Sequence, residues 1–458
     1  MIRMLIAAAA SGSGKTVVAC ALLRLLQRRG LAPCAFKCGP DYIDPMFHRS
    51  VLGAESRSLD LFLSGAEGVR RSFERSCRGH GAAVVEGVMG YYDGLGGTTD
   101  EASSWQVADT LALPALLVLR ARGASLTLSA QIKGMCAFRP RSRIAGVLLN
   151  GCSPALFRRL SPVLEREGGV PVLGCLPEMS AARFDSRHLG LYTAAEIGNL
   201  NARIDALADA LEENTDMDRL LALCEDGRAA ERPAPPVAAK PRAAVAVARD
   251  EAFCFIYAET LEALREQGAE LVFFSPLRDA ALPEGVGGVY LPGGYPELYA
   301  RQLSENEGMR ESVRRAVERG LPTVAECGGF LYLGQSLCAP DGTPFPMCGA
   351  LPGEAKNAGR AVRFGYVRVC AERDSLLFRA GERLPAHEFH YWDSTSPGDG
   401  LLCEKPVGER SWRCGFVSGE MYAAFPHLCF GAYPPLAERF VSRAERFAAR
   451  RRAENAGE

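Results

Sequence analysis

The sequence has no excess of charge of either sign. Its 53 Lys and Arg residues are balanced by 54 Asp and Glu residues, so the formal net charge is −1. Proteins that bind nucleic acid or an acidic membrane surface through general electrostatic attraction carry a basic excess instead. We therefore expect neither nucleic acid nor a membrane among the partners.

Long apolar runs and closely paired cysteines are also missing. No apolar stretch reaches the roughly 20 residues of a membrane-spanning helix. The 16 cysteines are scattered and include no Cys-x-x-Cys pair, which favours buried free thiols in a reducing compartment. The apolar start is short and runs directly into a glycine-rich loop, unlike a secretory leader. From these features we expect a cytoplasmic protein.

The length and the composition breaks predict two α/β domains. A chain of 458 residues is long for one domain, and four prolines fall between residues 232 and 242. Short apolar runs alternate with helical patterns on both sides of that segment, which is typical of parallel sheets covered by helices. The expected divisions are an N-terminal domain (1–225), a Pro-rich linker (226–242), a C-terminal domain (243–442) and a charged C-terminal helix or tail (443–458).

The expected strands are short, apolar and bounded by turn residues. One helix is expected at 17–29 and another from Pro435 onward, where proline suits the first turn. The expected strands are 4–9, 32–37, 82–86, 115–119 and 144–150 in the first domain, and 243–248, 271–275, 288–292 and 322–326 in the second.

A glycine-rich loop follows the first expected strand and precedes a helix. It reads Gly12-Ser13-Gly14-Lys15-Thr16. Glycine lets the backbone approach a phosphate, lysine reaches the outer phosphates and the hydroxyl suits Mg²⁺. The strict phosphate-loop pattern fails at its first glycine, and an ordinary turn before a helix is the alternative. Because the strand and helix context is right, we predict that these five residues bind ATP.

Four acidic residues fall near the ends of neighbouring strands. Asp41 and Asp44 follow the second strand, Glu86 ends the third, and Asp93 comes shortly after it. In parallel α/β sheets, ligands collect at this edge. Acids beside a triphosphate would repel it, so Mg²⁺ is implied, with Thr16, Asp41 and Glu86 as the predicted ligands. The alternative is that these acids are ordinary helix caps or surface charges.

A cysteine stands where a strand of the second domain should turn sharply into a helix. Such a turn exposes the thiol of Cys327 and directs the backbone N–H of Gly328 at a developing oxyanion. Gly294, in a second glycine turn after a strand, could supply the other donor. A thiolate needs a base, and His427 near the end of the domain is our candidate. The sequence leaves open that Cys327 is a buried structural thiol.

The base assignment has competitors. His387 and His390 also lie in this half, and His427 could itself be structural.

Several longer motifs resemble one family, cobyrinic acid a,c-diamide synthase. The resemblance spans about residues 2–440 in family order. The segments that carry it are 11–16, 36–45, 86–94 and 187–191 for the amidoligase half, and 292–297, 326–329 and 387–391 for the glutamine amidotransferase half.

The resemblance implies a fold and an activity. The fold would be a dethiobiotin-synthetase-like phosphate-loop domain with a parallel sheet, followed by a class I glutamine amidotransferase domain. The enzyme would be a glutamine-hydrolysing carbon–nitrogen ligase of cobalamin biosynthesis. It would convert the a and c acetates of a corrinoid to amides with L-glutamine, ATP and Mg²⁺. Asp41, Asp44, Glu86 and Asp93 would serve metal, ATP or substrate. A homodimer stays open.

Two positions depart from related amidotransferases. Ala325 replaces a glycine that many class I enzymes carry two residues before the nucleophile. Cys429 stands where class I relatives place a glutamate that orients the base, and where this family often has histidine. The sequence therefore leaves open which group orients His427.

Other activities remain as alternatives. The same chemistry could act on hydrogenobyrinic acid or a nickel sirohydrochlorin. Cobyric acid synthase is disfavoured by the motifs at 41–45 and 387–391, and a partition-type ATPase would have no use for a cysteine turn.

Overall fold

The structure is a computed structural model that describes residues 1–458 except 54–55, 183–185, 188–189, 192–196, 228–239 and 457–458. It divides into two compact units, Met1–Pro235 and Pro236–Glu458. Most of the expected linker and two residues of the motif at 187–191, His188 and Leu189, lie outside the described residues.

The N-terminal unit is built on a seven-stranded sheet in which all neighbouring strands run parallel. The expected α/β class is confirmed, but β3 and β7 were not expected. The strand order is β3-β2-β4-β1-β5-β6-β7. The strands are β1 Ile2–Ala8, β2 Pro33–Cys38, β3 Arg57–Leu59, β4 Ala82–Glu86, β5 Ala115–Arg120, β6 Ile144–Asn150 and β7 Val172–Leu176.

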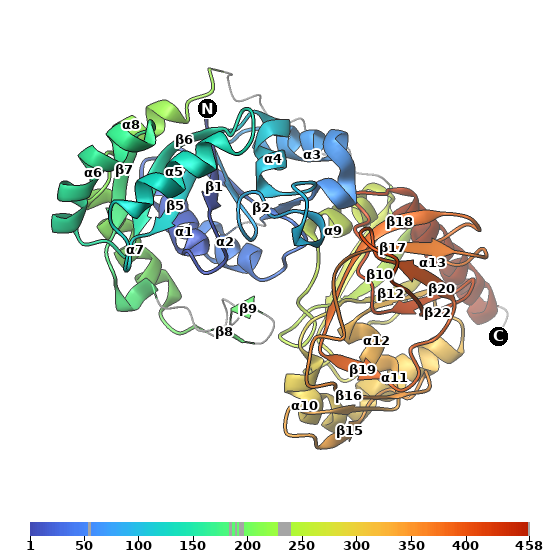
Figure 1. Cartoon of the computed structure of the whole chain (residues 1–458). Helices are drawn as coiled ribbons and strands as arrows, with labels where there is room; N and C mark the ends of the chain where they lie inside the picture. Colours follow the sequence, from blue (N-terminus) through green and yellow to red (C-terminus); the bar gives the residue numbers. More distant parts are fainter. Residues whose placement is uncertain (54–55, 183–185, 188–189, 192–196, 228–239, 457–458) are drawn as a thin grey trace. The chain divides into compact units, whose positions relative to one another are not determined.

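Helices cover both faces of this sheet (Figure 1). The chain runs outward from β1 through α1 and α2, and then returns across the other face, as right-handed crossovers require. Helices α1, α2 and α7 therefore share one face, and α3 to α6 share the other. The helices are α1 Lys15–Arg28, α2 Asp44–Leu52, α3 Leu61–Cys77, α4 Ser104–Leu111, α5 Thr127–Ala137, α6 Pro154–Gly168, α7 Leu200–Glu213 and α8 Met217–Leu223; β8 Ser186–Arg187 and β9 Gly190–Leu191 pair separately.

The C-terminal unit contains a six-stranded sheet in the order β11-β10-β12-β13-β23-β22. Its pairs are parallel except β22–β23. All four strands expected here are present within two residues of the expected bounds. The strands are β10 Ala243–Ala248, β11 Ala269–Phe274, β12 Gly288–Leu291, β13 Thr323–Glu326, β22 Phe416–Val417 and β23 Met421–Ala424.

Two hydrophobic cores lie on opposite faces of this sheet. Successive side chains of a strand point to opposite faces, so Val245 packs in one core and Ala246 in the other. The first core is covered by α9 Ala258–Glu266 and α13 Pro435–Ala456, and the second by α10 Ala300–Glu305, α11 Glu307–Glu318 and α12 Gly328–Leu333.

Two smaller sheets complete the unit. One has the order β18-β17-β20-β21 and is antiparallel; the other has the order β15-β14-β16-β19 and is mixed. The strands are β14 Ser336–Cys338, β15 Pro344–Pro346, β16 Glu354–Asn357, β17 Arg363–Ala371, β18 Arg383–His390, β19 Trp392–Ser394, β20 Leu401–Glu404 and β21 Ser411–Cys414.

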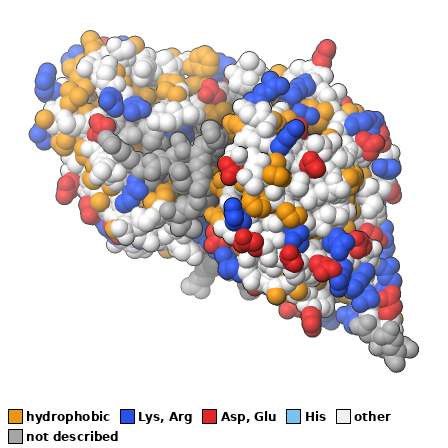
Figure 2. All heavy atoms as spheres, turned by 90° about the horizontal axis from the view of Figure 1, so that it is seen from below, with side chains coloured by type: hydrophobic (Ala, Val, Ile, Leu, Met, Phe, Trp, Pro, Cys, Tyr) orange, Lys and Arg blue, Asp and Glu red, His pale blue; other side chains and the backbone are white. Residues whose placement is uncertain are grey.

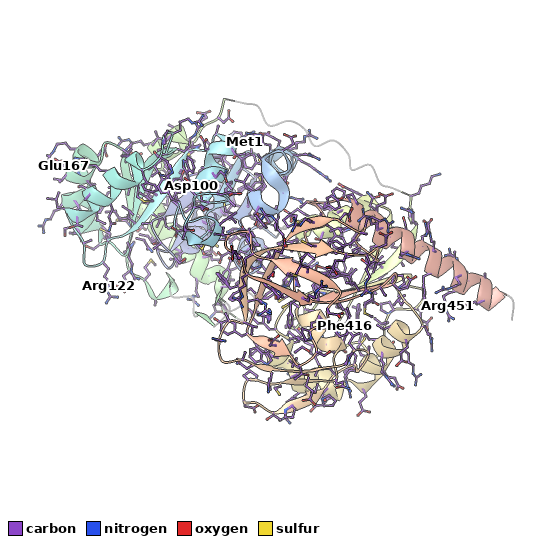
Figure 3. All side chains as sticks on the ribbon, turned by 45° about the vertical axis from the view of Figure 1, so that its right-hand side comes forward. Met1, Asp100, Arg122, Glu167, Phe416 and Arg451 are labelled. Atoms are coloured by element: carbon purple, nitrogen blue, oxygen red, sulfur yellow. The ribbon has the colours of Figure 1, made fainter. Side chains whose placement is uncertain are left out.

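The last helix, α13, begins at Pro435 and runs without a break to Ala456, across the boundary expected at residues 442 and 443. Phe440 and Ala444 are buried in the first core of the C-terminal unit. The side chains from Ala449 to Glu454 are exposed, and Arg451 lies among them (Figure 3). Arg451 donates to Glu454 at 3.0 Å. This helix therefore packs as part of the unit over most of its length.

The surface mixes both signs of charge. Basic and acidic side chains lie intermingled on the face drawn in Figure 2, as the near-zero net charge leads one to expect. All 16 cysteines lie among the described residues and outside any disulfide, and 13 of them are buried. Among the described helices, none is both long and apolar enough to cross a bilayer.

Candidate active sites

The glycine-rich loop joins β1 to α1 at the carboxyl edge of the N-terminal sheet. Gly14 has φ 95° and forms the N-cap of α1, a conformation that favours glycine. The ammonium of Lys15 donates to the carbonyl of Met89 at 2.6 Å and to that of Ala10 at 3.4 Å. Burial and the charge of Lys37 lower the pKa of Lys15 to about 8. An anion in the loop would favour the charged form of this lysine.

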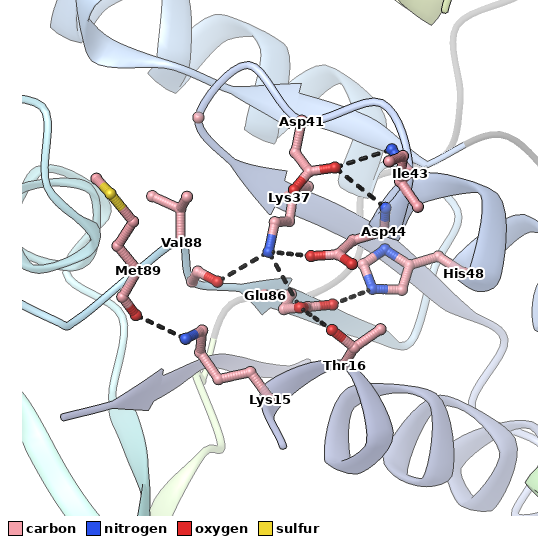
Figure 4. Close-up of polar contacts among 12 residues, drawn as sticks. Lys15, Thr16, Lys37, Asp41, Ile43, Asp44, His48, Glu86, Val88 and Met89 are labelled. Atoms are coloured by element: carbon pink, nitrogen blue, oxygen red, sulfur yellow. Dashed lines mark hydrogen bonds and ion pairs between the residues drawn. The ribbon is translucent and has the colours of Figure 1, made fainter. Parts of the chain in front are cut away.

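Glu86 lies at the centre of a buried polar cluster behind the loop (Figure 4). The parallel register sets it opposite Lys37 of β2. One carboxylate oxygen, Oε1, accepts from the hydroxyl of Thr16 at 2.7 Å and from Nζ of Lys37 at 3.0 Å. The other, Oε2, lies 2.8 Å from Nε2 of His48, whose Nδ1 is 2.9 Å from the hydroxyl of Ser56.

Lys37 is the charge that holds the cluster together. It is only 2% exposed and also contacts Asp44 at 2.6 Å. Burial would lower the pKa of Lys37, but the charges of Asp44 and Glu86 outweigh it and raise that pKa. Burial would likewise raise the pKa of Glu86, but Lys37 and the hydrogen bond from His48 hold it below its ordinary value. The pKa of Asp44 is raised by burial and by the neighbouring carboxylates of Asp41 and Glu86.

The other two predicted acids, Asp41 and Asp93, accept hydrogen bonds from backbone N–H groups of the loops that contain them. Asp41 accepts from the backbone N–H groups of Ile43 at 2.8 Å and Asp44 at 3.1 Å, which fixes the entry to α2. Asp93 accepts from the N–H of Gly90 at 2.8 Å. The structure thus brings Glu86 and Asp44 into one cluster, while Asp41 lies beside it and Asp93 shapes the loop that carries Met89.

The oxygens of Thr16 and Glu86 fit a magnesium ion. They are a hydroxyl and a carboxylate in contact, at the edge where phosphates would lie. Mg²⁺ usually takes one or two protein oxygens and completes its shell with water and phosphate. Within the described parts of the chain, no three His, Cys, Asp or Glu side chains group as a metal cage. The residues present therefore suit an ion that arrives with a nucleotide.

Cys327 lies between β13 and α12 in a strained backbone conformation. Its φ is 46° and its ψ is −102°, an arrangement that costs about 1–3 kcal/mol and is concentrated at functional turns. The side chain is buried, and burial together with the charges of Glu297 and Glu388 raises the pKa of its thiol. The thiol therefore needs a nearby base to react at neutral pH.

His427 faces this thiol across a glycine. A Cβ built on Gly293 would lie 2.4 Å from Cε1 and 3.3 Å from Nε2 of His427, and 3.5 Å from Cβ of Cys327. Both side chains thus border the same small space beside Gly293. The backbone N of Gly294 lies 3.1 Å from a Cβ built on Gly328, so the two predicted oxyanion donors are neighbours.

Nδ1 of the His427 ring faces Glu326, the residue before the nucleophile. Nδ1 of His427 lies 3.7 Å from Oε2 of Glu326. The same Oε2 accepts from the hydroxyl of Tyr290 at 2.8 Å, while Oε1 accepts from the N–H of Leu428 at 2.9 Å.

The two competing histidines have different surroundings. His387 exchanges backbone hydrogen bonds with His427, and its pKa is lowered to about 3 by burial and by the charge of His427. His390 stacks on Phe425 at 3.8 Å, and its ring nitrogens lie 2.7 Å from the carbonyl of Trp392 and 3.0 Å from Oε1 of Glu388.

Lys37, His48 and Glu326 are not among the residues predicted from the sequence. Both Lys37 and Glu326 lie inside motifs that carry the family resemblance. Lys37 stands two residues before Gly39 and Glu326 directly precedes Cys327, and that proximity was the available signal. No local pattern marks His48.

Two family models match the chain. Residues 4–191 match the CobQ/CobB/MinD/ParA nucleotide binding domain, and residues 244–435 match the CobB/CobQ-like glutamine amidotransferase domain. The first contains the glycine-rich loop and the Glu86 cluster, and the second contains Cys327 and His427.

Curated relatives match nearly the whole chain. Cobyrinate a,c-diamide synthase of Caldanaerobacter subterraneus subsp. tengcongensis is 36% identical, with 97% of this chain and 98% of the relative covered. The protein of the same name from Listeria innocua is 37% identical, with 95% and 98% covered. Hydrogenobyrinate a,c-diamide synthase of Streptomyces coelicolor is 40% identical, with 96% and 97% covered. The identity and coverage show that this chain belongs to the cobyrinate a,c-diamide synthase family.

Proposed function

We propose that this chain amidates the a and c acetate carboxylates of cobyrinic acid, with glutamine as nitrogen donor and ATP as the activating reagent. The observation that carries the proposal is the presence, in one chain, of a phosphate loop on a charged cluster and a strained cysteine beside a histidine. Neither half alone makes an amide from a carboxylate. Together they supply ammonia and an activated acyl group.

The C-terminal unit would hydrolyse glutamine. His427 takes the proton of the Cys327 thiol at Nε2, and Sγ forms a bond to the amide carbon of glutamine. The backbone N–H groups of Gly294 and Gly328 are assigned to the oxyanion. The C–N bond breaks as His427 returns the proton to the leaving nitrogen, which departs as ammonia. Water then hydrolyses the thioester and releases glutamate.

The N-terminal unit would activate the corrin carboxylate. Residues 12–16 hold the phosphates of ATP, and the γ-phosphoryl group passes to a carboxylate oxygen. Lys15 leaves the carbonyl of Met89 to contact the transferring group, since a phosphoryl oxygen is the stronger acceptor for its ammonium. Ammonia then attacks the acyl carbon and inorganic phosphate leaves. Activation is required because a free carboxylate is a poor acyl donor.

Mg²⁺ would be held by Thr16 and Glu86, where it supplies positive charge to the phosphates. Asp41 would be a further ligand of Mg²⁺, either through a bridging water or after a conformational change in its loop. Asp44 and Asp93 are assigned to positioning ATP or the corrinoid. The domain assignment that goes with these roles is 1–225 for the ligase and 243–442 for the amidotransferase.

The identity of the macrocycle is open to a direct test. The Streptomyces relative carries the hydrogenobyrinate name, so the cobalt-free ring is the second candidate. The purified chain should be incubated with glutamine, MgATP and each macrocycle in turn, and the products weighed. Two replacements of –OH by –NH₂ on cobyrinic acid are expected. Amidation of the cobalt-free ring alone would transfer the proposal to that substrate, and no glutamine-dependent product with any of them would overturn it.

A further inference from the structure

The carboxylate of Glu326 faces Nδ1 of the His427 ring. Nε2 borders the space shared with Gly293 and Cys327, while Nδ1 lies 3.7 Å from Oε2 of Glu326. The imidazole therefore stands between a thiol and a carboxylate. This is the order of groups in a nucleophile–base–acid triad.

Glu326 is itself held in place. It is 1% exposed, and its two oxygens accept hydrogen bonds from Tyr290 and from the backbone of Leu428. Leu428 directly follows His427, so the second bond joins Glu326 to the segment that carries the base. The carboxylate is thus fixed relative to the ring, and little movement would be needed to close 3.7 Å to a hydrogen bond when glutamine binds.

The structure assigns to Glu326 the role of orienting the His427 ring, for which the sequence identified no residue. We infer that Glu326 is a positioning residue for glutamine hydrolysis: it accepts from Nδ1–H of His427 and keeps Nε2 free to take the thiol proton. The inference rests on the proposed glutamine hydrolysis at Cys327. Related class I enzymes place this carboxylate two residues after the base, where this chain has Cys429. In this chain the carboxylate comes instead from the last residue of β13, the strand that pairs with β23.

The proton balance explains why a carboxylate at this place matters. When Sγ of Cys327 bonds to the amide carbon, its proton moves to Nε2 and the ring becomes an imidazolium. Glu326 then faces a full positive charge and stabilises it. The proton later leaves with the ammonia, and Glu326 remains ionised throughout.

Other charged or titratable groups surround the pair and must be distinguished from Glu326. His387 lies on β18 beside His427, Glu388 follows it, and Glu297 lies near Cys327 from the second glycine turn. Cys429 follows on the same segment as the base. Glu326 is the acid that places a carboxylate oxygen, Oε2, 3.7 Å from Nδ1 of His427.

The decisive variant is Glu326→Gln. The amide nearly matches the carboxylate in size and can keep the acceptor for Leu428, but its –NH₂ group would face Nδ1 and favour the Nε2–H tautomer. Labelling of Cys327 by a diazoketone analogue of glutamine should slow by at least about 100-fold near neutral pH, since removing the orienting acid of a comparable triad costs more than that. Because burial raises the pKa of the unassisted Cys327 thiol, the remaining reactivity should move to alkaline pH.

Two further variants separate orientation from packing. Tyr290→Phe removes a hydrogen bond to Glu326 but leaves the carboxylate, so labelling should stay within a few-fold of the original rate. Glu326→Asp keeps the charge on a shorter arm, and should recover part of the rate lost in Glu326→Gln with the original pH dependence. Ammonia-dependent amidation reports that the rest of each variant is folded.

Each outcome decides something. If the original chain does not label at Cys327, the proposed glutamine hydrolysis fails. If it labels and Glu326→Gln labels equally well, only the role of Glu326 is overturned. If Glu388→Gln, and not Glu326→Gln, shifts the pH profile, the orienting acid is Glu388 and the inference is wrong.

A measurement on the unaltered chain covers the case in which Glu326→Gln does not fold. The chain has six histidines, so ¹⁵N-labelled histidine gives a resolvable NMR spectrum. The resonance lost in His427→Asn should show the proton on Nδ1. A proton on Nε2 in the resting protein would contradict the inference.

Discussion

Replacing Lys37 by methionine should destabilise the N-terminal unit strongly. Methionine has a similar length, so the change removes the charge with little change in volume. It leaves the buried carboxylate of Glu86 and the partly buried carboxylate of Asp44 without their cation. At the Nζ–Oε1 distance of 3.0 Å, an effective dielectric of about 20 gives a Coulomb attraction of about 5.5 kcal/mol. Deleting one partner of such a buried pair typically costs about 3–5 kcal/mol in the free energy of unfolding.

The loss should be measured in the N-terminal unit alone. Hydrogen exchange of peptides from β1, β2 and β4, followed by mass spectrometry across a urea series, reports on that sheet. The double variant Lys37→Met/Glu86→Gln should lose less than the sum of the two single variants, by about 1–3 kcal/mol, because the second change removes one stranded charge. A loss below about 1 kcal/mol in Lys37→Met, or strict additivity, would refute the claim that this charge holds the cluster together.

Three more outcomes are expected. Cys327→Ser should abolish glutamine-dependent amidation and spare ammonia-dependent amidation, both measured by product mass; retention of glutamine use would exclude this nucleophile. Lys15→Ala should abolish amidation with either nitrogen source, and normal ammonia-dependent turnover would refute the phosphate-loop assignment. The hydrogen bonds from Arg439 lower the pKa of Glu382 from 4.5 to about 2, so the pair's stabilisation is complete above pH 4.5 and is lost as the pH falls toward 2. Arg439→Met should therefore lower the free energy of unfolding by about 1 kcal/mol at neutral pH and by less near pH 3; equal losses would contradict the pairing.

Local sequence signals gave most of the framework. The expected strand at 243–248 coincides with β10, and the expected helix at 17–29 overlaps α1, because a glycine-rich loop followed by an apolar 3.6-residue period is a local property. The helix expected from Pro435 also begins there. The two strands that were not expected have weak local signals. β3 has three residues, and β7 is a five-residue apolar run that a buried helix segment could also contain.

The residues of the candidate sites likewise divide into those that a local sequence pattern marks and those that only strand pairing brings together. A phosphate loop and a cysteine turn each need special backbone at consecutive residues, so Gly14 and Cys327 could be found in the sequence. The partners of a buried charge come from other strands and are set by register. Asp41 and Asp93 were grouped with Glu86 on their place near strand ends, whereas the structure turns each of them to its own loop.

By itself, the sequence determined that a strand would deliver Lys15 to a glycine-rich turn before a helix and that another would deliver Cys327 to a sharp bend. It did so because backbone conformation is set largely by neighbouring residues. Only the tertiary structure decided that Lys37 neutralises Glu86 and that Glu326 stands behind His427. The last pair is separated by about a hundred residues of chain, and parallel pairing of β13 with β23 brings its two segments together. The sequence left that role open, because the position at which related enzymes place the orienting acid holds Cys429 here, and spacing along the chain does not give distances across a sheet.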